Sequence, residues 1–362
     1  MPNPNPNQNT NTAQENVLEV DNLKTYFYTD AGVARSVGGV SFSIPRGSTV
    51  ALVGESGCGK SVTSLSIMRL LQEPMGRIVS GQIRYFGEQG MIDLAQASKK
   101  EMQRIRGREI AMIFQEPMTS LNPVFTIGSQ IDEMVSLHNP KLTRQQVREI
   151  TLETLRQVGI ARAEGICRSY PHELSGGMRQ RIMIAIAVCC KPSLLIADEP
   201  TTALDVTIQA QILELLQDLK EKTNTSILLI THDLGVVAQM ADYVVGMYAG
   251  KVVEEGTAWQ VLLHPSHPYT IGLIRSKPVL GSVRKRLYSI PGTVPSPLDL
   301  PDYCPFYNRC ERRRDNCRQA MPALCQVEDP SGDGHSHKAA CFYAGEEMDA
   351  GEKNAVEPER RL

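Results

Sequence analysis

The sequence contains no long hydrophobic segment. Its 362 residues include no run of about 18 or more uncharged apolar residues, so no segment is predicted to cross a bilayer. The N-terminal tract, residues 1–16, is rich in Pro, Asn, Gln and Thr and lacks the apolar centre that a signal peptide needs. We therefore expect a disordered N-terminal tract and a protein that stays in the cytosol.

A strong net charge is also absent. The 38 Lys and Arg residues nearly balance the 40 Asp and Glu residues, which leaves a formal charge of −2. Because nucleic-acid-binding domains are usually basic, this balance argues against a nucleic-acid partner, although a local basic patch is compatible with it. Hydrophobic residues, at 41%, suffice for a core, and the length allows two or three domains.

A glycine-rich segment stands between the apolar run 49–53 and the amphipathic stretch 62–71. This order predicts a strand, a phosphate-binding loop and a helix, because the glycines let backbone N–H groups converge on phosphate oxygens at the positive end of the helix. Lys60 is then placed for the β- and γ-phosphates, and Ser61 supplies a hydroxyl to Mg²⁺. An ordinary Gly/Ser surface turn is the alternative. The loop comprises Gly54, Glu55, Ser56, Gly57, Cys58, Gly59, Lys60 and Ser61.

Polar side chains follow three later apolar runs. They are Gln115 after 109–114, Asp198 and Glu199 after 193–197, and His232 after 226–231. Ligands gather at the C-terminal edge of parallel strands in open α/β sheets, so all four are site candidates. We expect Asp198 to hold Mg²⁺ opposite Ser61, Glu199 to polarise an attacking water and His232 to contact the γ-phosphate. Loop or helix capping, and a core position for His232, are the alternatives.

Helical spacing prevails in the block between these strands. The segment 143–158 follows a Thr cap, and no strand pattern intervenes before the run 174–177, Leu-Ser-Gly-Gly. Ser and Gly at a helix start form a second anion-binding N-terminus, which is weak evidence by itself. Asp205 lies near the positive end of the next helix, 206–222. The pattern predicts a helical insertion in an α/β body.

The segment before the phosphate loop has strand character. Alternating residues at 17–20 and 40–44 predict half-buried strands. Three adjacent rings, Tyr26, Phe27 and Tyr28, lie between them. One ring can stack on a nucleotide base, or all three can simply pack a strand.

Cysteines crowd the end of the chain. Prolines become dense after about residue 263, so we place a domain boundary there, with an extension at 264–343 and a charged tail at 344–362 that we expect to be disordered. The extension holds Cys304, Cys310, Cys317, Cys325 and Cys341. In a reducing cytosol such a cluster indicates a metal before a disulfide.

The identity of that metal stays open from spacing alone. Zinc sites usually contain Cys pairs two to four residues apart, and none occurs here, although His335 and His337 can complete a mixed site. Four well-separated thiolates suit an iron–sulfur cluster at least as well. Free or adventitiously paired thiols are the third possibility.

The motifs stand together in an order that is typical of one family. They are the loop 54–61, Gln115, the run 174–177, the pair Asp198 and Glu199, Asp205, and His232. On these residues the chain resembles the ATPase subunit of an ATP-binding cassette (ABC) transporter over about 17–263. The resemblance implies an α/β fold, with a phosphate-loop ATPase core and an antiparallel β subdomain. It also implies a helical subdomain at about 116–182 that carries the family signature, which is the run 174–177.

The resemblance also implies that two such subunits sandwich two ATP molecules. Each ATP would be bound by the phosphate loop of one subunit and by the signature of the other, so that Ser175, Gly176 and Gly177 would serve ATP held by the partner. Phe27 would stack on adenine, with Tyr28 as the second choice.

Further roles follow from the same resemblance. Gln115 would contact Mg²⁺ and the attacking water, Glu199 would be the general base, and His232 would sense the γ-phosphate. Asp205 would contribute to the ATP site. Cys58 departs from the serine or other small residue that is usual at its position, and it adds a thiol that oxidants or alkylating agents are expected to reach.

Three segments resemble the dipeptide/oligopeptide importer branch of the family. They are the run 113–117, the run 267–270 (His-Pro-Tyr-Thr), and the segment from Cys304-Pro305-Phe306 to Arg309-Cys310. The branch imports peptides, or nickel in some members, and antimicrobial peptides are a further possible cargo. The resemblance implies a second homologous ATPase subunit in a heterodimer, two permease subunits, an extracytoplasmic binding protein, and a peripheral place on the cytoplasmic face of the bacterial inner membrane.

Some members of this branch with a similar tail carry a [4Fe–4S] cluster. The resemblance favours Cys304, Cys310, Cys317 and Cys341 as its ligands and leaves Cys325 as an extra.

Two other classes of cassette ATPase are disfavoured by what the chain lacks. Chromosome-clamping ATPases carry long coiled-coil insertions, and no sustained heptads occur between residues 115 and 174. Ribosome-acting cassette proteins carry two cassettes, whereas this sequence has one phosphate loop and one signature.

Overall fold

The computed structural model of the chain describes residues 16–115, 120–202, 204–277, 288–328 and 334–346. Most of the two predicted disordered tracts, 1–16 and 344–362, lies outside this part. Asn16 already belongs to the first strand. Glu346, near the start of the predicted tail, forms an ion pair with Arg314 at 2.5 Å. Residues 116–119, which begin the predicted helical subdomain, also lie outside the described part.

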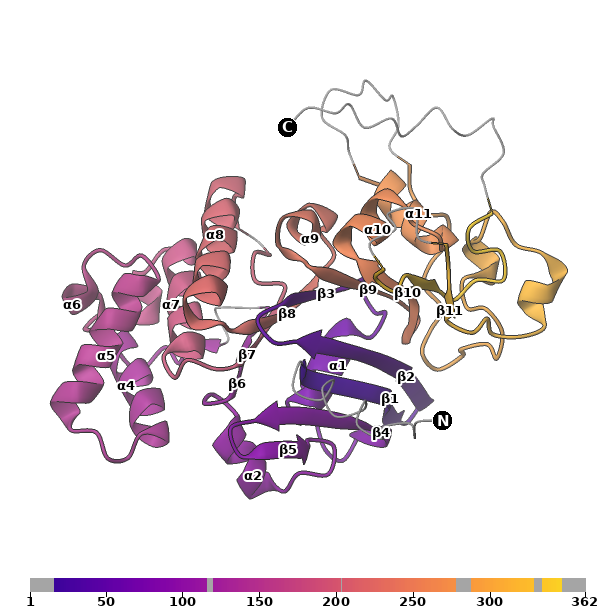
Figure 1. Ribbon diagram of the computed structural model, residues 1–362. Coiled ribbons are helices and arrows are strands. Elements are labelled where there is room, and N and C mark those ends of the chain that lie inside the picture. Colours follow the sequence, from indigo (N-terminus) through magenta and orange to yellow (C-terminus); the bar gives the residue numbers. More distant parts are fainter. Residues whose placement is uncertain (1–15, 116–119, 203, 278–287, 329–333, 347–362) are drawn as a thin grey trace, which may run out of the picture.

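Two sheets organise the molecule (Figure 1). The smaller sheet is antiparallel, in the order β2-β1-β4-β5. Its strands are β1 (Asn16–Thr29), β2 (Gly32–Pro45), β4 (Gly76–Gly87) and β5 (Gly90–Asp93). Alternating buried and exposed positions along β2 explain why one face of this sheet packs on the core while the other meets solvent.

The larger sheet has the order β11-β12-β10-β9-β3-β8-β7-β6. Its strands are β3 (Thr49–Val53), β6 (Ile110–Ile113), β7 (Leu194–Asp198), β8 (Ser226–Thr231), β9 (Tyr243–Tyr248), β10 (Lys251–Thr257), β11 (Cys325–Gln326) and β12 (Lys338–Ala339). Strands β9, β3, β8, β7 and β6 pair in parallel. Every residue of β3, β6, β7 and β8 is buried, as expected for continuous apolar strands covered on both faces.

Helices pack around the two sheets, and α4, α5 and α6 form a separate group beside α7 (Figure 1). The described helices are α1 (Lys60–Ile67), α2 (Lys99–Ile105), α4 (Ile127–His138), α5 (Arg144–Gln157), α6 (Ala163–Ile166), α7 (Gly176–Val188), α8 (Val206–Thr223), α9 (Leu234–Met240), α10 (Ala258–Leu263) and α11 (Pro268–Arg275), with short 3-10 turns η2 (Pro171–Glu173), η3 (Tyr307–Arg309) and η4 (Asp315–Arg318). Helix α5 begins at the predicted cap, where Thr143 and Gln146 form a reciprocal capping box. None of the helices in the described ranges is long and apolar enough to cross a membrane.

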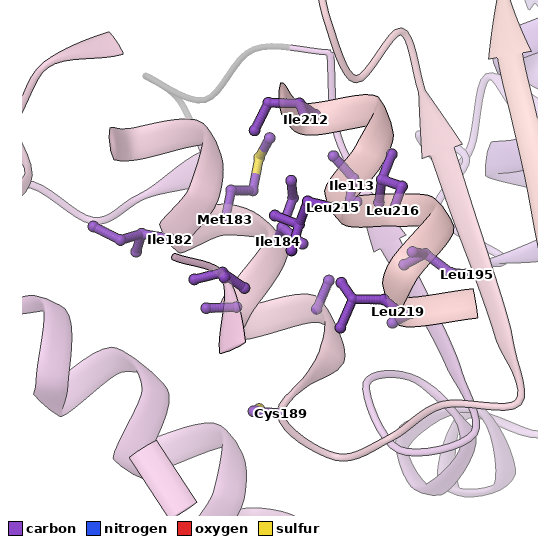
Figure 2. Close-up of a cluster of buried hydrophobic side chains, with 14 of the residues drawn as sticks. Ile113, Ile182, Met183, Ile184, Cys189, Leu195, Ile212, Leu215, Leu216 and Leu219 are labelled. Atoms are coloured by element: carbon purple, nitrogen blue, oxygen red, sulfur yellow. The ribbon is translucent and has the colours of Figure 1, made fainter. Parts of the chain in front are cut away.

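A buried cluster fixes α7 and α8 to β7 and to the edge strand β6 (Figure 2). Ile184 of α7 and Leu216 of α8 are fully buried against Ile113 and Leu195, which are 0% and 1% exposed. Burying one such side chain contributes about 1.5–3 kcal/mol. The helix that carries the signature is therefore held rigidly against the sheet that carries the acidic pair.

The C-terminal extension packs directly on the larger sheet. The predicted boundary near residue 263 coincides with the end of α10. Beyond it, β12 pairs with β10, and the buried Nε2 of His337 lies 2.9 Å from Oε1 of Glu254. Glu254 also accepts hydrogen bonds from the backbone of Ser266 and His267. The extension thus adds two strands to the ATPase sheet, which the sequence pattern did not predict.

Candidate nucleotide site and cysteine cluster

The predicted phosphate loop joins β3 to α1. Gly54 and Gly59 have φ angles of +152° and +102°. A Cβ atom would lie 2.3 Å from the carbonyl oxygen of Met247 at the first and 2.4 Å from that of Ser36 at the second, so only glycine fits. The Nζ atom of Lys60 lies 2.8 Å from the carbonyl oxygen of Gly54. The loop's own backbone therefore orients the ammonium group.

The strand end of β7 faces this loop. Ser61 donates a hydrogen bond of 3.2 Å from Oγ to Oδ1 of Asp198, so the two predicted Mg²⁺ ligands lie side by side. Burial raises the pKa of Asp198 to about 6, and the charge of Glu199 adds to this effect. A buried carboxylate beside a second acid is stabilised by a cation, so the oxygen donors here fit Mg²⁺.

Glu199 lies at the centre of a polar group. Its Oε2 accepts hydrogen bonds from Nε2 of Gln115 at 3.0 Å and from Oγ1 of Thr202 at 2.8 Å, and its Oε1 lies 2.9 Å from Nδ1 of His232. Gln115, Glu199 and His232 follow the neighbouring strands β6, β7 and β8, so these three predicted catalytic residues meet at one edge of the sheet. The backbone of Glu199 adopts a φ of +48°, which is uncommon for a non-glycine residue.

The surroundings keep the Glu199 carboxylate charged. Partial burial raises its pKa, but hydrogen bonds from His232 and Thr202, together with the charge of Lys60, outweigh burial, and the net pKa is lowered. Thr202 was not among the sequence-predicted residues. It stands three positions after Glu199, and no sequence motif marked it.

The signature residues lie elsewhere. The side chain of Ser175 accepts a hydrogen bond from the N–H of Met178 and caps α7, which begins with Gly176 and Gly177. Helix α7 belongs to the helical group at the left of Figure 1, whereas α1 lies below the strands in the middle. Asp205 caps α8 through a 2.9 Å bond from the N–H of Ile208. One chain therefore does not bring its signature and its phosphate loop together.

Two further predictions concern Phe27, which was expected to stack on adenine, and the thiol of Cys58. Phe27 is half-buried in β1, and its ring lies against Gly76, which leaves no room there for a larger residue. Cys58 is 0% exposed, and burial raises the pKa of its thiol. Both features disfavour the expected reaction of Cys58 with oxidants or alkylating agents, because reactivity needs an accessible thiolate.

Four of the five C-terminal cysteines surround one small cavity of about 20 Å³. They are Cys304, Cys310, Cys317 and Cys341. Burial raises the pKa of both Cys304 and Cys310 to about 11, and the neighbouring thiols of the cluster add to the increase. Cys325 is exposed on β11 and does not line the cavity.

The cysteine cluster is not a formed metal site as it stands. In the part of the chain that the structure describes, no three His, Cys, Asp or Glu side chains are arranged to hold a metal ion. His337, a candidate for a mixed zinc site, instead contacts Glu254. The donor set itself consists of four clustered thiols, of which Cys317 is buried and the other three are half-buried. Such a set fits the thiolate ligands that an iron–sulfur cluster requires.

Sequence reasoning missed two residues that contact the phosphate loop. Arg309 forms an ion pair with Glu55, and the hydroxyl of Tyr269 accepts a hydrogen bond from the N–H of Glu55. Both residues lie in segments that the resemblance had marked, but no local pattern connects them to a loop more than 200 positions away.

The comparisons with known proteins agree with this site. A family model described as ABC transporter matches residues 37–202, and one described as the C-terminal region of oligopeptide/dipeptide transporters matches residues 253–317. The chain is 54% identical to the oligopeptide transport ATP-binding protein AppD of Bacillus subtilis over 308 residues, which are 85% of this chain and 92% of AppD. The chain belongs to the ABC transporter family. It is an ATP-binding subunit of this family that hydrolyses ATP.

A second sequence relative and two solved structures are also similar to this ABC subunit. It is 47% identical to the dipeptide transport ATP-binding protein DppD of Escherichia coli, over 90% of this chain and 96% of DppD. The structure of cbiO1 from Clostridium perfringens, part of the ABC transporter complex cbiONQ, matches with a TM-score of 0.58 at 28% identity, over 69% of this chain and 92% of cbiO1. The dimeric cassette MJ0796 bound to ADP and Pi matches with a TM-score of 0.59 at 24% identity, over 67% of this chain and 98% of the MJ0796 chain. These structures confirm the predicted fold class.

Proposed function

We propose that this ABC subunit powers the import of dipeptides or oligopeptides across the cytoplasmic membrane. One observation carries the proposal. The similarity to the peptide transport proteins AppD and DppD extends over nearly their whole length, and residues 253–317 match the model described as the C-terminal region of oligopeptide/dipeptide transporters.

The residues at the sheet edge have distinct roles in this proposal. Lys60 binds the β- and γ-phosphates, and Ser61 and Asp198 hold Mg²⁺, which supplies positive charge to the phosphate oxygens. Glu199 accepts the proton of the water that attacks the γ-phosphorus, and the bond from that phosphorus to the bridging oxygen of ADP breaks. Gln115 and His232 keep the base oriented. The lowered pKa of Glu199 supports this role, because the base is ionised at neutral pH.

The remaining nucleotide contacts come from both subunits. Phe27 stacks on adenine, and the backbone of the loop residues Gly57 and Gly59 binds phosphates. Ser175, Gly176 and Gly177 of one subunit bind ATP held by the other, with Asp205 beside them. The separation of α7 from α1 within one chain supports such a shared site.

We also propose that Cys304, Cys310, Cys317 and Cys341 bind a [4Fe–4S] cluster. Their place around one cavity, and the exposure of Cys325 outside it, support this ligand set over one that contains Cys325. Zinc is the alternative metal. The cluster stabilises a segment that has little apolar periodicity of its own.

The assembly in this proposal contains a second homologous ATPase subunit, two integral-membrane permeases and an extracytoplasmic binding protein. The subunit then lies peripherally on the cytoplasmic face of the bacterial inner membrane. Nucleic acid is not a partner.

The cargo is tested with the reconstituted complex. Permeases, both ATPase subunits and the binding protein are assembled in proteoliposomes, and ATP hydrolysis is measured with the binding protein loaded with a tripeptide or with Ni²⁺. We expect the tripeptide to stimulate hydrolysis and Ni²⁺ to have no effect. Stimulation by Ni²⁺ alone would identify a nickel importer and contradict the proposal.

A further inference from the structure

The C-terminal extension reaches the phosphate loop through one arginine. The Nη1 and Nη2 atoms of Arg309 lie 2.5 and 3.0 Å from the two carboxylate oxygens of Glu55, the second residue of the loop. Arg309 is only 7% exposed. A two-pronged guanidinium–carboxylate contact is stronger and more directional than a single ion pair. It therefore fixes the position of the Glu55 side chain.

The cysteine cluster and Arg309 share one piece of backbone. Arg309 ends the 3-10 turn η3, in which the N–H of Tyr307 donates to the carbonyl of Cys304 at 3.0 Å and the N–H of Cys310 donates to the carbonyl of Tyr307 at 3.3 Å. Cys304 and Cys310 flank this turn. The direction of the Arg309 side chain thus depends on the same few residues that place two of the clustered thiols.

Buried aromatic rings pack around the guanidinium group of Arg309. The guanidinium carbon of Arg309 lies 5.8 Å from the ring centre of Tyr248 and 5.9 Å from that of Phe306. Tyr269 packs against both rings, and its hydroxyl oxygen accepts a 2.7 Å hydrogen bond from the N–H of Glu55. The extension therefore holds the backbone of Glu55 as well as its side chain.

Glu55 in turn borders the atoms that bind ATP. Its carbonyl oxygen lies 3.0 Å from Nζ of Lys60. A free carboxylate at this place would repel the polyphosphate of ATP. Arg309 cancels this charge and keeps the Glu55 side chain turned toward the extension.

We propose that the cysteine-bearing extension forms part of the nucleotide site, because Arg309 positions the phosphate loop through Glu55. ATP affinity then depends on whether the extension holds Arg309 in this place. The proposal rests on the ATP site described above but not on which metal the cysteines bind. Arg309 is a positioning residue, because its contact is with Glu55 and not with ATP.

The test measures the Kd of Mg²⁺-ATP by calorimetry in the Glu199→Gln protein, in which hydrolysis does not interfere. Arg309→Gln leaves Glu55 charged and unpaired, and we expect the Kd to rise about tenfold, equivalent to about 1.4 kcal/mol. Arg309→Lys keeps the charge, and we expect a smaller loss. Arg313→Gln, an exposed arginine four positions away, is the control and is expected to leave the Kd within about twofold.

A second substitution at Glu55 distinguishes the effect of an unpaired charge from the effect of a misfolded extension. Adding Glu55→Gln to Arg309→Gln removes the unpaired charge, so we expect affinity to recover by severalfold, whereas a merely unfolded extension would show no recovery. Cys310→Ser should also weaken ATP binding, and it should add nothing in the Arg309→Gln background, because both changes act through one contact.

The outcomes are distinguishable. An Arg309→Gln protein that binds ATP within twofold of its parent would overturn the inference while leaving the ATP site intact. A parent that binds no ATP would contradict the nucleotide site itself, and with it this inference. Additive effects of Cys310→Ser and Arg309→Gln would show that the extension does not act through Arg309.

Discussion

Replacing the proposed base, Glu199, by Gln removes its charge without removing its volume. The carboxylate receives hydrogen bonds from Gln115 and Thr202 on one oxygen and contacts His232 through the other. A glutamine amide can keep all three contacts if its oxygen faces Gln115 and Thr202 and its NH₂ group donates to the neutral Nδ1 of His232. We therefore expect the free energy of unfolding to change by less than about 1 kcal/mol.

The chemical effect should be far larger than the structural one. An amide does not accept the proton of the attacking water, and loss of a general base typically costs a factor of about 10² to 10⁴ in rate. In the assembled complex, kcat for ATP hydrolysis should fall by this factor in Glu199→Gln, while the Kd for Mg²⁺-ATP stays within about threefold. The assays are phosphate release and calorimetry on the same preparation.

Thr202→Val is the matched control for Glu199→Gln. It removes one hydrogen bond to the carboxylate but leaves the base, so kcat should fall by about tenfold or less, equivalent to about 1.4 kcal/mol. If Glu199→Gln retained near-normal turnover, Glu199 would not be the base. Equal losses in both variants would instead indicate that the hydrogen-bonded arrangement matters and not the proton transfer.

Four further predictions concern pH, assembly, the core and the cysteines. Burial raises the pKa of Asp198 to about 6, so between about pH 4 and pH 6 the folded protein keeps a proton on Asp198 that the unfolded chain releases. The free energy of unfolding therefore falls by about 3 kcal/mol as pH rises through this window. Asp198→Asn should therefore raise the free energy of unfolding at pH 7.5 while it weakens Mg²⁺-dependent hydrolysis, and unchanged stability in urea titrations would contradict this. The isolated subunit should hydrolyse ATP slowly, with a rate that rises when partner subunits and permeases are added; a high rate independent of concentration would refute the shared site. Leu216→Ala, in the core of Figure 2, should cost about 2–5 kcal/mol, whereas Leu263→Ala, 53% exposed, should cost less than about 0.5 kcal/mol. Anaerobically purified protein should contain about four iron and four sulfide per chain, and Cys310→Ser should lose them while Cys325→Ser keeps them; stoichiometric zinc in a colourless protein would rule out the iron–sulfur cluster.

Much of the nucleotide site could be predicted from short segments of sequence. The phosphate loop, the strand ends at Asp198 and His232, and the capped helix at Thr143 each depend on residues close together in the chain. Parallel strands bring such ends to one edge whatever the details of packing. This is why Gln115, Glu199 and His232 meet in the structure as the sequence pattern predicted.

Long-range contacts could not be predicted in this way. The pairing of β12 with β10, and the contact of Arg309 with Glu55, join segments that are more than 80 and more than 250 positions apart. Their residues carry no periodicity, since η3 is a single turn and β12 has two residues. The burial of Cys58 was missed for the same reason, because its cover includes Met247 of β9 and Tyr269 of α11.

Peptide uptake by living cells tests the central claim most directly. Cells that lack the gene for this ABC subunit, but retain its partner subunits, are supplied with the wild-type chain or with Glu199→Gln at equal expression, and uptake of a radiolabelled tripeptide and of ⁶³Ni²⁺ is measured. We predict that the wild-type chain restores tripeptide uptake, that Glu199→Gln does not, and that Ni²⁺ uptake is unchanged. Equal tripeptide uptake with and without the wild-type chain would contradict the claim.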